Sequence, residues 1–195
     1  MSELRLDSAK RSAQIRSPGN NQVSHDRYDG YRDALQEAGI ALDPALILEG
    51  DFEPSGGYSC AHALFARPLA ERPTAIFAGS DLIAYGVISA AQECGLRIPS
   101  DIALIGFDDN PSSAHMQPAL TTIQQPFAEM GRRAVELLLH LIDQSCFPHW
   151  SQQDQPGLFC EIPRIQLPTS LKIRESCGMP LPIHDRGHDE RPVGP

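Results

Sequence analysis

Two uninterrupted apolar runs of strand length lie near the middle of the chain, at residues 74–78 and 102–107. Between them, residues 83–91 carry apolar side chains at helical spacing, and Ser80 and Asp81 in front of them are good N-cap residues. Strands without polar alternation are typical of a parallel sheet covered on both faces. The pattern therefore predicts a βαβ unit, and the expected fold class is a doubly wound, mostly parallel α/β sheet.

The residues before this unit predict two further helices and a short strand. Residues 1–25 are polar and lack periodicity, so we expect regular structure to begin at Asp26. The helix that starts there is expected to end at Gly39, which stands where a C-cap glycine would. A short apolar strand follows at 45–48, and a second helix begins at Pro54.

The residues after the unit predict one long helix between short strands. In order, they are a strand at 121–125, an amphipathic helix at 127–142, a loop at 145–157 and two edge strands at 159–162 and 171–173. From Gly178 onward prolines, histidines and charges dominate, so a disordered tail is expected over 178–195.

The composition is that of a folded, acidic protein. Hydrophobic residues make up 41% of the 195, enough for a core, and the formal net charge is −9. An acidic chain repels phosphate, so direct DNA binding by this polypeptide is not expected. The start is polar and no apolar run reaches about 18 residues, so neither a signal peptide nor a membrane span is predicted. Five cysteines without tight pairing fit reduced thiols, and the expected location is the cytoplasm.

A series of short motifs follows one another between about residues 17 and 177. They lie at 27–35 (RYDGYRDAL), 50–52, 55–56, 72–81, 84–86, 95–99, 105–109 (IGFDD), 118–123 (PALTTI), 125–126, 130–131, 167–169 and 173–177. In this order and spacing the set resembles the lactose-repressor (LacI/GalR) family of transcription regulators, although each motif alone would be a weak signal.

The resemblance implies a core like that of the type I periplasmic binding proteins, in which two α/β subdomains close over a small effector, usually a sugar or a nucleobase. Residues 13–177 would form this effector-binding domain, after a non-matching, disordered start at 1–12. Full-length relatives are expected to be homodimers that contact DNA through an amino-terminal helix-turn-helix. That domain and nearly all of the first subdomain would lie before Met1, so the chain is expected to be a truncated sensor. A gene remnant and a misassigned start codon are both open interpretations.

Two segments raise questions about this resemblance. Residues 12–19 (SAQIRSPG) are polar where the family has a smooth apolar strand, so the sequence leaves the first position of the sheet open. The helix at 126–143 packs on the first subdomain in the family. Without that partner its apolar face is exposed, so we expect an oligomeric or poorly soluble chain, which a monodisperse monomer in light scattering would contradict.

Sugar recognition requires a donor fork for vicinal hydroxyls, carboxylate acceptors and an apolar surface for the ring. Arg27 supplies the fork, and Asp108 supplies an acceptor at the end of a buried strand, at the sheet edge where doubly wound folds bind ligands. Both resemble effector contacts of the family. The alternatives are a surface arginine in the first turn of a helix and an N-cap or Asx-turn aspartate. Asp109 is expected to be structural.

Five further positions resemble family pocket residues. Ser80 stands where the family often has Asn, and it makes one fewer directed hydrogen bond. Asp81 is interpreted as a helix N-cap, with ligand contact as a second role. Phe52 matches an aromatic that stacks on sugar rings, with a loop-anchoring core residue as the alternative. Gln125 and Phe127 match positions at the crossing between the two subdomains.

The sequence carries no recognisable catalytic motif. A nucleophile elbow, a dinucleotide-binding loop, a P-loop and the zinc-protease spacing are all absent, and no cofactor or metal is expected. The leading interpretation is therefore the ligand-sensing part of a DNA-binding repressor, with a small-molecule effector, most simply a sugar, as its partner. The alternatives are a transport-type sugar-binding protein, which shares the core fold, and a small α/β hydrolase that uses Asp108 or Asp81.

Overall fold

The computed structural model describes residues 11–19, 22–143 and 164–179. Contacts divide the chain into two compact units, Met1–Ile123 with Leu171–Pro195, and Gln124–Ser170. The first unit contains the sheet, and the second contains one long helix. Each unit is described by itself below.

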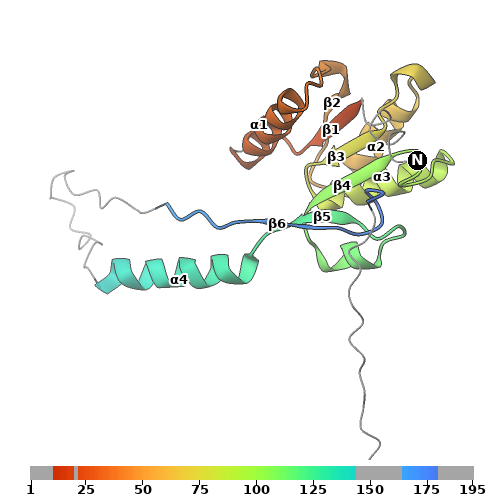
Figure 1. Ribbon diagram of the computed structural model, residues 1–195. Helices are drawn as coiled ribbons and strands as arrows, with labels where there is room; N and C mark the ends of the chain where they lie inside the picture. The colour runs from red at the N-terminus through yellow and green to blue at the C-terminus, as the bar shows by residue number, and fades with distance from the viewer. Residues whose placement is uncertain (1–10, 20–21, 144–163, 180–195) are drawn as a thin grey trace, which may run out of the picture. The chain divides into compact units, whose positions relative to one another are not determined.

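The sheet has six strands in the order β2-β1-β3-β4-β5-β6. The strands are β1 (Ser12–Arg16), β2 (Ile47–Glu49), β3 (Ala75–Ala78), β4 (Ala103–Asp108), β5 (Thr121–Gln124) and β6 (Ser170–Lys172). Three neighbouring pairs are parallel, β1 with β2, β1 with β3 and β3 with β4 (Figure 1). The doubly wound, mostly parallel α/β fold is therefore confirmed.

Strand β1 occupies the sheet position that the sequence left open at residues 12–19. It pairs with β2 on one side and β3 on the other, and its residues Ala13, Gln14 and Ile15 are no more than 1% exposed. The expectation that order begins only at Asp26 was therefore wrong. Pairing on both sides satisfies the backbone of β1 whatever its side chains, and the Gln14 amide donates a hydrogen bond to the Arg27 carbonyl oxygen.

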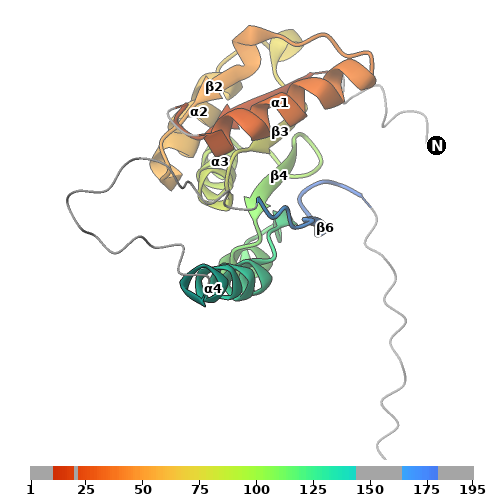
Figure 2. The same cartoon turned by 90° about the vertical axis from the view of Figure 1, so that its left-hand side faces the viewer.

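Three helices cover the sheet of the first unit. Helix α1 (Gln22–Glu37) lies on one face, and α2 (Pro54–Phe65) and α3 (Asp81–Glu93) lie on the other (Figure 1, Figure 2). Strand residues such as Ile76 and Leu104 form one buried cluster with helix residues such as Leu64, Ile83 and Val87. The predicted stops are confirmed, because α1 ends two residues before Gly39 and α3 two before Gly95, and both glycines have a φ of +68°.

Local boundaries differ slightly from those expected. The chain forms a 3-10 turn η2 at Pro44–Leu46 before β2, so the predicted strand at 45–48 starts two residues late. Two other 3-10 turns are η3 (Leu69–Glu71) and η4 (Pro111–His115). The Asp43 carboxylate accepts a hydrogen bond from Ala45 N, which favours a turn over an extended chain at this point.

The second unit contains α4 (Phe127–Asp143), the amphipathic helix that the sequence predicted. Its large apolar side chains Phe127, Val135 and Leu139 are each at least 55% exposed. None of the described helices is long and apolar enough to cross a membrane. The loop predicted at 145–157, the strand at 159–162 and the tail from 180 onward lie outside the described residues.

Candidate functional site

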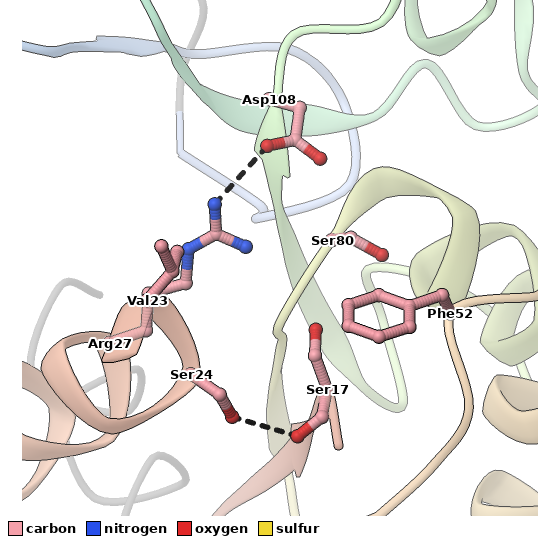
Figure 3. A pocket seen from close by; sticks show the side chains of 7 residues that line it. All are labelled: Ser17, Val23, Ser24, Arg27, Phe52, Ser80 and Asp108. Carbon is pink, nitrogen blue, oxygen red and sulfur yellow. Dashed lines mark hydrogen bonds and ion pairs between the residues drawn. The ribbon is translucent and has the colours of Figure 1, made fainter. Parts of the chain in front are cut away.

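A pocket of about 320 Å³ lies at the carboxyl edge of the parallel strands. Its lining comes from the residues that follow β1 (Ser17), β2 (Phe52) and β3 (Ser80), from the end of β4 (Asp108) and from the start of α1 (Val23, Ser24 and Arg27) (Figure 3). In doubly wound sheets, adjacent parallel strands whose following helices lie on opposite faces leave a crevice between them. Strands β1 and β3 are such a pair, since α1 and α3 cover opposite faces. Strand order therefore accounts for the position of the pocket.

Arg27 is held in this pocket by several interactions. One terminal nitrogen donates to the Gly79 carbonyl oxygen, the other lies 3.4 Å from Asp108 Oδ1, and the guanidinium carbon lies 3.8 Å from the centre of the Phe107 ring. Burial lowers the pKa of Arg27, while the neighbouring Asp108 carboxylate acts in the opposite direction. An arginine remains charged under such a shift, so the pocket holds a fixed cation beside an anion.

The two adjacent aspartates diverge because of the backbone between them. Asp108 has a φ of 121° and Asp109 a φ of 57°, both in the region that favours glycine. This turn directs Asp108 into the pocket, whereas Asp109 forms an ion pair of 2.6 Å with Arg174. The expectation that Asp109 is structural is confirmed. Unusual backbone angles of this kind, which destabilise the fold by roughly 1–3 kcal/mol each, cluster at ligand sites.

Asp81 has a different role from the one expected. Ser80 is the N-cap of α3, with its Oγ accepting from Ile83 N, so the N-cap assignment of Asp81 was wrong. Asp81 is 1% exposed, and its carboxylate accepts from Asn110 N (2.7 Å), Ser113 Oγ (2.6 Å) and Thr122 Oγ1 (2.6 Å). Both oxygens are thus occupied inside the protein, and Asp81 does not line the pocket. It joins the start of α3 to η4 and β5.

Ser80 and Phe52 both line the pocket. Ser80 caps α3 through its oxygen and also lines the pocket. Phe52 lines the pocket with 51% of its surface exposed, so it is not the buried loop anchor that was its alternative role. Exposed aromatic rings at a pocket mouth suit stacking on the apolar face of a sugar.

Gln125 and Phe127 belong to the second unit, at the start of α4. Phe127 N donates to the Gln125 carbonyl oxygen, and the Phe127 ring is 55% exposed. Neither residue is among those that line the pocket of the first unit. Their contribution to a ligand site therefore stays a prediction.

Three lining residues were missed from the sequence, namely Ser17, Val23 and Ser24. All three lie in the stretch that was expected to be irregular, because β1 was left open and α1 was placed four residues late. With β1 recognised, the position of Ser17 directly after an interior parallel strand would have pointed to the carboxyl edge of the sheet.

The comparison with known families decides the classification. A family described as a periplasmic binding protein-like domain matches residues 7–177 of the chain. The chain belongs to this family. Within it, the chain is an effector-binding core of the LacI/GalR type.

Individual relatives of this periplasmic binding protein-like domain are transcription regulators. The HTH-type transcriptional repressor PurR of Haemophilus influenzae (strain PittEE) is 43% identical over 123 residues, which are 63% of this chain and 36% of PurR. A LacI-family regulatory protein from Chloroflexus aggregans has a TM-score of 0.75 at 34% identity, over 90% of this chain and 58% of that one. The transcriptional regulator CelR in complex with cellobiose has a TM-score of 0.73 at 32% identity, over 89% and 48%. The chain thus spans about a third of the length of its curated relatives.

Proposed function

We propose that this chain is the ligand-sensing part of a LacI/GalR-type transcription repressor and that its effector is a neutral sugar. The observation that carries the proposal is the pocket at the carboxyl edge of the parallel strands. It is lined by Arg27 and Asp108, which lie 3.4 Å apart, and by the exposed aromatic ring of Phe52. A guanidinium fork donates to vicinal hydroxyls, a carboxylate accepts from them, and Phe52 offers an apolar surface to the ring. These are the three chemical elements of sugar recognition.

The charges in the pocket favour a neutral ligand. Its lining contains one cation, Arg27, and one anion, Asp108, beside three serines, a valine and a phenylalanine. A phosphate would be repelled by Asp108, and a cationic ligand would be repelled by Arg27, whereas an uncharged polyol engages both. The cellobiose bound by the relative CelR is a ligand of this class.

The regulatory role is proposed from the relatives. Effector binding in such a repressor favours one of two conformations and so alters the affinity for DNA. With a net charge of −9, this polypeptide is repelled by the phosphate backbone of DNA. We therefore assign DNA recognition to a separate domain of a complete repressor. Gln125 and Phe127 are proposed as effector contacts of the complete repressor, and the repressor is proposed to act as a homodimer. No catalytic step is assigned.

Binding of sugars to the full chain tests this proposal. Arg27→Met and Asp108→Asn are each expected to weaken binding of cellobiose or D-glucose by roughly 10–100-fold, since a charge-assisted hydrogen bond is worth about 1.5–3 kcal/mol. Ligand-observed NMR titration would measure the dissociation constants, including those as weak as millimolar. Arg32→Met is a matched control on α1, because Arg32 is exposed, does not line the pocket and, within the described part of the chain, forms ion pairs with the nearby Asp29 and Asp33. Sugar binding that neither pocket substitution changes would contradict the proposal.

A further inference from the structure

The pocket contains a buried hydroxyl that has no hydrogen-bond partner among the residues that the structure describes. Ser17, directly after β1, is only 4% exposed, and its Oγ is among the buried side-chain atoms that lack a partner. Its backbone is engaged, since the Ser17 carbonyl oxygen accepts from Ser24 Oγ at 2.7 Å. The carbonyl oxygen of Ser17 therefore has a partner, whereas its side-chain hydroxyl has none among the described residues.

The surroundings of Ser17 show that this hydroxyl is closely packed rather than loosely placed. A Cβ atom added at Gly79 would lie 3.1 Å from Ser17 Oγ, so the absence of a side chain at Gly79 leaves the space that the hydroxyl fills. Figure 3 shows Oγ directed into the region between Arg27 and the Phe52 ring. Arg27 Nε, from the same pocket, is a second buried polar atom without a partner. Two unsatisfied atoms in one pocket indicate hydrogen bonds that a ligand would complete.

We propose that Ser17 is a specificity-determining residue, whose hydroxyl hydrogen-bonds to one hydroxyl group of the sugar held by Arg27 and Asp108. This inference rests on the proposed function. A serine hydroxyl both donates and accepts, and its proton turns about the C–O bond without any movement of Oγ, so the packed hydroxyl can meet either a donor or an acceptor of the ligand. A sugar that lacks this hydroxyl leaves Ser17 unsatisfied and is bound less well.

The stability of the free chain provides a first test. Ser17→Ala removes an unsatisfied buried group, so its urea midpoint is expected to equal or exceed that of the wild type. Ser176→Ala is the matched control: Ser176 is fully buried, donates to the Leu104 carbonyl oxygen at 2.7 Å and accepts from Thr121 N at 2.8 Å. Its midpoint is expected to fall. If Ser17→Ala lowers the midpoint as Ser176→Ala does, Ser17 is a structural residue and the inference is wrong.

Binding provides the second test, with cellobiose, D-glucose and their monodeoxy derivatives as probes. Ser17→Ala is expected to weaken binding of the parent sugar about tenfold, the equivalent of one hydrogen bond. One monodeoxy derivative is expected to bind the wild type and Ser17→Ala equally, because the partner hydroxyl is already absent. Ser89→Ala, on the exposed side of α3, should behave as the wild type with every probe.

The outcomes separate this inference from the proposed function. If the wild type binds a sugar and Ser17→Ala binds all probes with unchanged affinity, the inference fails while the proposed function stands. If the wild type binds none of these probes, both are overturned.

Discussion

Asp81→Ala is expected to lower the free energy of unfolding by about 3–4 kcal/mol. The substitution removes the acceptor of three donors, Asn110 N, Ser113 Oγ and Thr122 Oγ1. Of these, Ser113 Oγ keeps a hydrogen-bond partner in the Tyr85 hydroxyl, 2.8 Å away, so two donors are stranded. The two hydroxyl-bearing residues are fully buried, so water cannot replace the carboxylate. Each stranded donor destabilises the fold by about 1–3 kcal/mol, and part of this is recovered because a buried charge is removed.

Urea denaturation followed by circular dichroism would measure this effect. Asp33→Ala is the matched control, because Asp33 is an exposed aspartate whose partner is the adjacent Arg32, and surface ion pairs of this kind contribute little. The loss of unfolding free energy in Asp81→Asn is expected to lie between those of Asp81→Ala and Asp33→Ala, since an amide keeps one acceptor oxygen. An Asp81→Ala chain within about 1 kcal/mol of the wild type would show that the three bonds do not hold this part of the fold together.

Gly86→Ala is expected to destabilise the chain by about 3 kcal/mol, at the upper end for overpacking. Gly86 lies in α3 where that helix crosses α2, and an added Cβ would overlap the Pro54 carbonyl oxygen and lie 2.5 Å from Tyr58 N. These are backbone atoms, so no side-chain rotation relieves the overlap and the helices must separate. Gly57 makes the reciprocal approach from α2, where an added Cβ would overlap the Ile83 carbonyl oxygen.

Substitution of Gly30 by alanine is expected to stabilise the chain, the opposite of the effect at Gly86. Gly30 lies within α1, and an added Cβ would meet no atom within 4 Å. Gly30→Ala should therefore stabilise the chain by about 0.5–1 kcal/mol, the difference in helix propensity between glycine and alanine. Thermal unfolding of the two variants beside the wild type gives the comparison. Equal shifts of the melting temperature in the same direction would contradict the close crossing of α2 and α3.

The fold was predictable wherever a local pattern reflects burial. Strands β3 and β4 are apolar throughout and α3 has helical spacing with a glycine at its end, so the βαβ unit followed from the residues alone. The polar residues in β1 hid an interior strand of the sheet, the one between β2 and β3. Its hydrogen bonds come from β2 and β3, which begin 31 and 59 residues after the end of β1. The residues next to β1 in the sequence therefore do not indicate this pairing.

The candidate site was predictable in part for the same reason. Arg27, Phe52, Ser80 and Asp108 were expected from the family resemblance, and the fold brings these four into one pocket. Asp81 could not be assigned from its neighbours in sequence, because its hydrogen-bond partners lie 29, 32 and 41 residues away. Ser17 was missed because its position depends on β1.

The sequence by itself determined the fold class, the βαβ unit at the centre of the sheet, the amphipathic character of α4 and the family of the chain. These depend on periodicity and on ordered motifs, which are properties of neighbouring residues. Only the tertiary structure decided that β1 lies between β2 and β3, that Asp81 is a buried acceptor and that Ser17 faces the pocket. Hydrogen bonds between segments distant in the chain create those roles, and a buried polar group acquires its function from the partners that the fold supplies or withholds.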